Sequence, residues 1–240
     1  MDYLLVLLAG LAAGTLSGIV GFGSSIMMLP VLVVVFGPLQ AVPIMAIAAL
    51  MANLSRILVW YREVDWKACG VYALTGVPCA ALGARTLLAL PPRIIEILLG
   101  VFFILMIPIR RALHARGMRL RLPHLAIVGA VIGFLTGVVV STGPINVPFF
   151  LAYGLVKGAF LATEAAGSLL VYGAKTLVFR GFGALPAEAI VKGLIVGSSL
   201  MAGSYLAKPF VLSLPPERFR LLMEGLMLVS GTAMIVSALA

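Results

Sequence analysis

The sequence predicts an all-α integral membrane protein with almost no domain outside the bilayer. Of its 240 residues, 62% are hydrophobic and only 10% are charged. Soluble domains are roughly 45–50% apolar and about 25% charged, so this composition is typical of a chain surrounded by lipid. In addition, long apolar runs, many near the ~20 residues that cross a bilayer as a helix, recur along the whole chain.

Apolar segments separated by polar or helix-breaking residues define the expected elements. The segments 24–37 and 144–156 are too short to cross a bilayer comfortably, and we expect half-helices or arms of re-entrant hairpins there. The remaining eight are expected to be transmembrane helices, and they cover 3–20, 41–61, 68–90, 94–109, 124–141, 160–179, 187–207 and 217–239.

Residues 110–123, RRALHARGMRLRLP, form a polar linker that divides the chain into a first part, 1–109, and a second part, 124–240. Five of the seventeen basic residues lie between Arg110 and Arg121. A concentrated basic loop is typical of the cytoplasmic side of a membrane protein. The net charge of +9 therefore predicts an orientation in the membrane, and no nucleic-acid partner is expected.

The two parts resemble each other, which predicts an internal duplication. The matches are three glycines at a constant step of 119 positions (Gly10, Gly14 and Gly18 with Gly129, Gly133 and Gly137), Arg56 with Lys175 at the same step, Pro30 with Pro148, and LPPR at 90–93 with LPPE at 214–217. If the two short segments cross the membrane, the repeats are inverted; if they do not, the repeats are parallel. The distribution of basic residues favours the inverted arrangement, and both remain open at this stage.

Each glycine row is expected to be a helix-packing face, because small residues four apart let two helices approach closely in a bilayer. The breaks that follow the rows, GFGSS at 21–25 and VSTGPIN at 140–146, free backbone groups that are costly to leave unpaired in lipid. A helix N-terminus at such a break suits an anion, although a plain kink is the alternative. The candidate anion-binding residues there are Gly21, Gly23, Ser24, Ser25, Ser141, Thr142, Gly143 and Asn146.

Two cations in the predicted spans, Arg56 and Lys175, are candidates for the same anion site. Asn53 and Tyr172 each precede one of them by three residues, on the same helix face. The alternative is that both cations extend to the membrane interface. Glu164 is a candidate for proton coupling, and pairing or helix capping would explain it equally.

Other chemistry is not expected. The two histidines have no cysteine or carboxylate at metal-ligand spacing, and no phosphate-binding loop is present. No residues match a nucleophile elbow or a pair of catalytic carboxylates. We therefore predict that the protein is not an enzyme and that it needs no cofactor or metal.

Two segments, GLAAGTLSGIVGFGSSIMMLPVL and GAVIGFLTGVVVSTGPINVPFF, resemble the two copies of the motif of the TauE/SafE sulfite exporter family. This chain has Ser24 and Ser25 where the family usually has glycines. The resemblance implies a secondary transporter of the bacterial inner membrane for sulfite, sulfonates or related small anions. Expected partners are that anion, the lipid bilayer, protons or another coupling ion, and a second copy in a homodimer. An anion channel and a membrane-embedded scaffold subunit are the alternatives.

Overall fold

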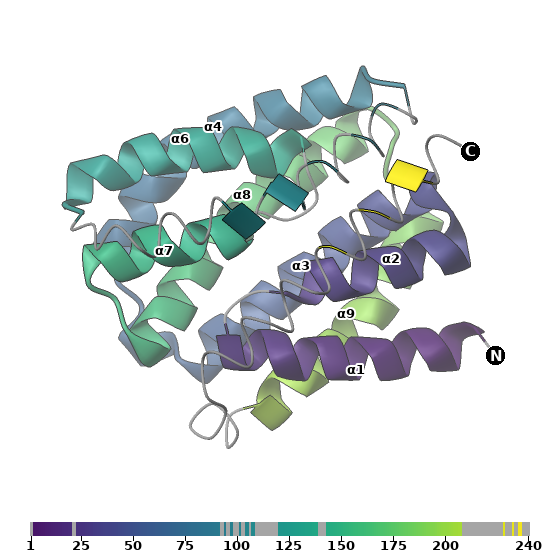
Figure 1. Cartoon of the computed structure of the whole chain (residues 1–240), viewed down its shortest axis with the longest axis horizontal. Helices are drawn as coiled ribbons and strands as arrows, with labels where there is room; N and C mark the ends of the chain where they lie inside the picture. The colour runs from purple at the N-terminus through teal and green to yellow at the C-terminus, as the bar shows by residue number, and fades with distance from the viewer. Residues whose placement is uncertain are drawn as a thin grey trace.

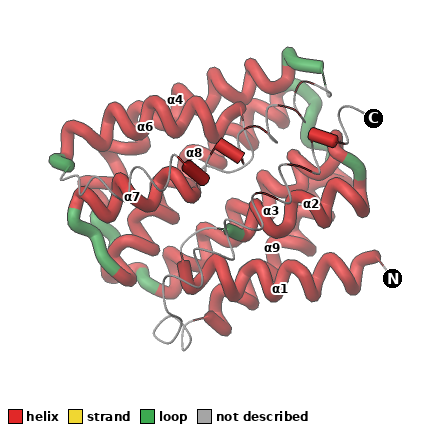
Figure 2. Tube along the Cα trace, viewed as in Figure 1, coloured by secondary structure: helices red, strands yellow, loops and turns green. Residues whose placement is uncertain are grey.

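The computed structural model describes residues 2–20, 23–91, 120–138 and 143–207, together with isolated positions in 94–108 and 228–236. Every regular element in these ranges is helical, so the predicted all-α class is confirmed for the part of the chain that the structure describes (Figure 2). The linker segment 110–119 and most of the predicted helices 94–109 and 217–239 lie outside the described residues.

The helices follow the predicted order closely. The short segments are separate helices, α2 and α7, and a short 3-10 helix, η1, precedes α4. The bounds are α1 Asp2–Val20, α2 Ser24–Phe36, α3 Pro38–Val59, η1 Tyr61–Glu63, α4 Trp66–Leu88, α6 Leu122–Val138, α7 Gly143–Tyr153, α8 Lys157–Gly181 and α9 Ala187–Ala207.

Three of the described helices are long and apolar enough to cross a membrane: Gln40–Val59, Trp66–Leu88 and Ala187–Ala207. Leu4–Ile19, Met27–Phe36 and Leu122–Val138 are shorter apolar helices. These lengths and compositions support a membrane protein. The expected total of eight spans stays a prediction.

Local sequence explains where these helices begin. The side chain of Asp65 accepts hydrogen bonds from the backbone N–H groups of Lys67 and Ala68, both at 3.0 Å, and so caps the start of α4. Between α2 and α3, Gly37 has φ 79°, a conformation that glycine adopts without steric cost, and Pro38 then opens α3. The chain therefore reverses within one residue, and α2 and α3 form a tight helical hairpin.

The helices are arranged in two bundles that do not coincide with the two halves of the sequence (Figure 1). The first bundle contains α1, α2, α3 and α9, and the second contains α4, α6, α7 and α8. Within them, α9 packs against α1 and α3, and α4 packs against α6 and α8. The bundles meet where α3 packs against α8. Among the described helices, each bundle thus takes one from the other half of the chain.

The two glycine rows are packing faces, as predicted. A Cβ atom on Gly14 would overlap the backbone of Leu200, and one on Gly133 would overlap the backbone of Gly76. The contacts advance in the same direction along both partners of each pair, so α1 is parallel to α9 and α6 is parallel to α4. The pairs are Gly10–Ser199, Gly14–Leu200 and Gly18–Ser204, and Gly129–Tyr72, Gly133–Gly76 and Gly137–Ala80.

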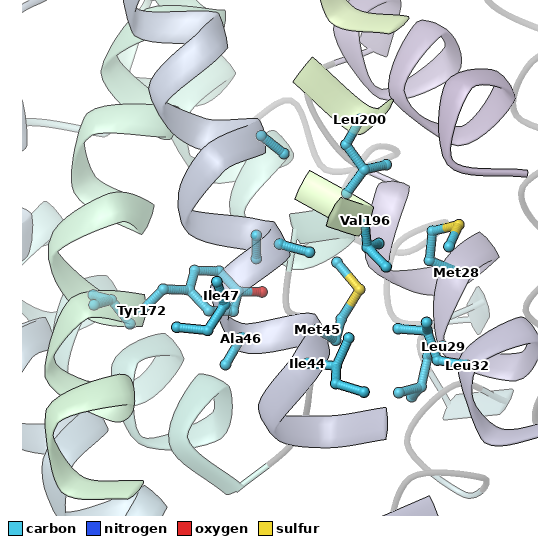
Figure 3. Close-up of a cluster of buried hydrophobic side chains, with 14 of the residues drawn as sticks. Met28, Leu29, Leu32, Ile44, Met45, Ala46, Ile47, Tyr172, Val196 and Leu200 are labelled. Atoms are coloured by element: carbon cyan, nitrogen blue, oxygen red, sulfur yellow. The ribbon is translucent and has the colours of Figure 1, made fainter. Parts of the chain in front are cut away.

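The first bundle contains a group of buried apolar side chains. Met28 and Leu32 of α2, Ile44 and Met45 of α3, and Val196 of α9 are buried together (Figure 3). Aliphatic and thioether side chains have no hydrogen bonds to satisfy, so they exclude water from this part of the structure. We call Met28, Leu29, Leu32, Ile44, Met45, Val196 and Leu200 the apolar cluster.

Candidate functional site

An ion pair joins the two bundles. The guanidinium Nη1 of Arg56, in the last turn of α3, donates to the carboxylate Oε2 of Glu164 in α8 at 3.1 Å. Both side chains are buried, with 7% and 2% of their surface exposed. Taking two charges out of water is costly and is tolerated when each finds good partners, so this pair indicates a specific role.

Glu164 is held from the second bundle. Its other oxygen, Oε1, accepts a 2.6 Å hydrogen bond from the Ser168 hydroxyl and a 3.1 Å bond from the amide Nδ2 of Asn146. The hydroxyl of Tyr72 donates to Asn146 Oδ1 at 3.1 Å, and the Tyr72 ring packs against Phe150 at 5.3 Å between centroids. Asn146 is the last residue of the predicted break and belongs to the first turn of α7.

Arg56 is only partly satisfied. Its Nη2 donates to Oδ1 of Asn53, one turn earlier on α3. Its Nε is buried and has no hydrogen-bond partner among the described residues. A guanidinium offers five donors in a planar fork that matches a carboxylate or another oxyanion, and an unmet buried donor is expensive. We call Asn53, Arg56, Tyr72, Asn146, Glu164 and Ser168 the buried polar network.

Lys175 lies apart from this network. It is eleven residues after Glu164 on α8, about 16 Å along the helix axis. Its Nζ donates to the backbone carbonyl of Thr136 at 3.0 Å and lies 5.4 Å from the Phe179 ring centroid. Lys175 and Arg56 are both buried, at 1% and 6% exposure, so the alternative that they extend to the membrane interface is wrong.

The structure brings only some of the predicted site residues together. Asn53, Arg56, Asn146 and Glu164 are in direct contact, and Tyr172 of α8 lies near Arg56, buried in the core that also contains Ala46 and Ile47 (Figure 3). The remaining residues are at the breaks: Gly23 with φ 108° before α2, buried Ser24 and Ser25 at its start, Gly143 at the start of α7, and Gly21, Ser141 and Thr142 outside the described residues.

Two members of the network were not predicted from sequence. Ser168 follows Glu164 by four residues, so the rule that such residues face each other on a helix would have found it. Tyr72 offers no such signal, because its partner Asn146 is 74 positions away and its neighbours on α4 are apolar or small. Only the packing of α4 beside α7 and α8 reveals its role.

A helical membrane protein with a buried, hydrogen-bonded ion pair between two bundles has the features of a membrane transporter. The chain belongs to the family described as Sulfite exporter TauE/SafE, whose match covers residues 6–234. Comparison with curated proteins and with solved structures gave no significant match. The resemblance seen in the sequence is therefore confirmed over nearly the whole chain, and the family is one of transporters.

Proposed function

We propose that the protein is a secondary active transporter that moves a small anion, a sulfur oxyanion or an organosulfonate, across the membrane by alternating access. The observation that carries this proposal is the position of Arg56. It is a buried cation on the first bundle, it faces Glu164, Asn146 and Ser168 of the second, and its Nε has no partner among the described residues. A site formed by two bodies can open and close when they move against each other.

The donors around Glu164 suit an oxyanion. Arg56 Nη1, Asn146 Nδ2 and the Ser168 hydroxyl all point at its two carboxylate oxygens. Sulfite and sulfonate groups present oxygens of similar spacing and the same sign of charge, so the same donors fit them. The first turn of α7 adds the positive end of a helix dipole close to Asn146.

We further propose that the two halves are inverted repeats. Arg56, late in α3, pairs with Glu164, early in α8, whereas Ile47, earlier in α3, lies beside Tyr172, later in α8. These equivalent helices therefore run antiparallel. Helices related by a two-fold axis in the membrane plane run antiparallel, while parallel repeats would make them parallel.

Because α9 packs in the first bundle and α4 in the second, the units expected to move in transport differ from the two halves of the sequence. Each glycine row fastens a helix of one half to a helix of the other, with backbones too close for a Cβ atom. Such close packing resists sliding. We therefore expect the two bundles, rather than residues 1–109 and 124–240, to be the rigid bodies of the transport cycle.

The test is uptake of radiolabelled sulfite, thiosulfate, sulfoacetate, taurine and simple carboxylates into proteoliposomes that contain the purified chain. A secondary transporter accumulates its anion against a gradient when an ion gradient is imposed. An anion channel, the first alternative, dissipates an anion gradient and never builds one. A scaffold subunit, the second alternative, neither binds nor moves any of these anions when purified alone.

A further inference from the structure

We infer that the Glu164 carboxylate competes with the transported anion for Arg56. Glu164 must therefore be protonated before the anion binds, so that one proton enters the site with each anion. This inference rests on the proposed transport function and specifies how it is coupled. The carboxylate holds Arg56 in the described structure. Protonation of Glu164 removes its charge, releases the guanidinium and makes room for one external oxyanion.

The first support is electrostatic. Two negative charges that share one cation at contact distance repel each other, and the repulsion is strong away from water. An anion is therefore expected to bind Arg56 poorly while Glu164 is charged. The described groups that face the network include one cation, Arg56, since Lys175 bonds at the far end of α8.

The second support is the supply of donors. Protonation weakens the hold of Glu164 on Arg56 Nη1, Asn146 Nδ2 and the Ser168 hydroxyl. Arg56 Nε already lacks a partner among the described residues. An oxyanion with three oxygens can accept from these groups together, and the protonated carboxyl can donate to it as well.

The third support is that the fold does not need this network. The repeat steps of the sequence give the counterparts of the network residues. The step of 119 positions that relates Arg56 to Lys175 also relates Met45 to Glu164. The step of 118 positions that relates Pro30 to Pro148 also relates Met28 to Asn146. A third step, of 124 positions, relates LPPR to LPPE. The same step relates Gly76 to Leu200, which are the residues contacted by the equivalent glycines Gly133 and Gly14, and it relates Tyr72 to Val196. Met28, Met45 and Val196 meet in the apolar cluster (Figure 3).

The counterparts of three network members thus pack together in the first bundle with no polar atom among them except two thioether sulfurs. A buried ion pair is often neutral or unfavourable for stability compared with apolar packing of similar volume. The same geometry filled with methionine and valine is an adequate core. The polar version in the second bundle is therefore best explained by function.

Several other ionisable groups lie near Glu164 on the elements that pack against it. From the segment before α4, the Glu63 carboxylate lies against Gly158 and the backbone N–H of Asp65 donates to Thr163 Oγ1 at 2.9 Å. Tyr72 of α4 is itself a member of the network, Tyr172 faces the network from α8, and Lys157 begins α8. Among these, Glu164 is the carboxylate in direct contact with Arg56.

Charge balances in the proposed cycle. The empty site holds one guanidinium and one carboxylate, which sum to zero. The loaded site holds the guanidinium, a neutral carboxyl and one anion. A monovalent anion therefore crosses with one proton and no net charge, and a divalent anion carries one net negative charge.

The test begins with unmodified protein, so it does not depend on a variant that folds. Thiosulfate and sulfoacetate are used because their charges do not change near neutral pH. In weakly buffered detergent solution with a pH indicator, we expect about one proton to be taken up for each anion bound. Binding without proton uptake would overturn the inference and leave the proposed transport function intact.

Glu164→Gln then removes the carboxylate that is proposed to take up the proton. Glu188→Gln is the matched control, because Glu188 is exposed and paired with Lys192. In proteoliposomes, we expect Glu164→Gln to exchange internal for external thiosulfate but to lose uphill uptake driven by a pH gradient. The control is expected to retain both. If Glu164→Gln still accumulates thiosulfate when a pH gradient is imposed, the inference is wrong. If the unmodified protein neither binds nor moves either anion, both the inference and the proposed transport function are wrong.

Discussion

Arg56 on α3 and Glu164 on α8 form a buried ion pair, 3.1 Å between Nη1 and Oε2, across the contact between two helical bundles. The pair thus places a cation on one bundle and its counterion on the other, so a relative movement of the bundles would change the strength of the pair. In the proposed transport cycle, the charge of the transported anion also acts on this pair.

The pair predicts a clear result in a double-mutant cycle. Arg56→Gln leaves the Glu164 carboxylate buried without its counterion, and removal of one partner of such a pair typically costs about 3–5 kcal/mol. Arg56→Gln combined with Glu164→Gln is expected to recover much of that loss, because neither charge remains. Thermal unfolding of the purified variants in detergent measures both, and additive effects of the two changes would show that the residues are not coupled.

Anion charge provides a second prediction. If Arg56 binds the transported anion, Arg56→Gln weakens binding of a divalent anion more than that of a monovalent one, since the Coulomb energy scales with charge. We expect the loss for divalent thiosulfate to exceed the loss for a monovalent sulfonate by about tenfold, or ~1.4 kcal/mol. Isothermal titration of both anions measures the difference. Equal losses would show that the guanidinium does not contact the anion.

The glycine faces predict a sharp difference within one helix. A Cβ atom on Gly83 of α4 would overlap the carbonyl oxygen of Phe134, so Gly83→Ala is expected to destabilise the protein by about 1–3 kcal/mol. Gly70, on the same helix, has nothing within 4 Å of such an atom, and Gly70→Ala is expected to be neutral or to gain up to ~1 kcal/mol. Unfolding temperatures that fall equally for both would refute the packing interpretation.

The start of α2 provides a fourth prediction. Ser24 is buried within the first predicted helix break, and Ser24→Leu is expected to abolish anion uptake while expression and folding stay close to normal. Asn146→Leu, at the second break, is expected to abolish uptake because it removes a direct contact of Glu164. Ser198→Leu, at an exposed serine of α9, is the matched control. Normal uptake by folded Ser24→Leu protein would remove Ser24 from the site.

Sequence alone predicted the helical class, both short helices, the glycine packing faces and four members of the polar network. These features depend on local patterns: apolar length, four-residue spacing and helix-breaking residues. It did not predict that α4 and α9 exchange bundles, because partner choice depends on contacts between distant segments. For the same reason, Tyr72 was missed, and Lys175 was placed in the same site as Arg56 although about 16 Å of α8 separates it from Glu164.

The apolar cluster illustrates a further limit. From sequence, Met28 and Met45 are ordinary members of hydrophobic segments. Their importance appears only when the repeat steps of the chain are laid over the observed contacts, which place them at the positions equivalent to Asn146 and Glu164. Equivalent positions of the two bundles therefore carry apolar side chains in the first bundle and hydrogen-bonded polar side chains in the second.

The most direct test of the account is the location of a bound anion. Selenite has the pyramidal shape of sulfite and the same three oxygen atoms that accept hydrogen bonds, and the anomalous scattering of selenium marks its position in crystals of the protein. We expect one selenium site with its oxygens within hydrogen-bonding reach of Arg56 and Asn146, and the Arg56–Glu164 contact broken. A selenium site elsewhere, with that ion pair intact, would contradict it.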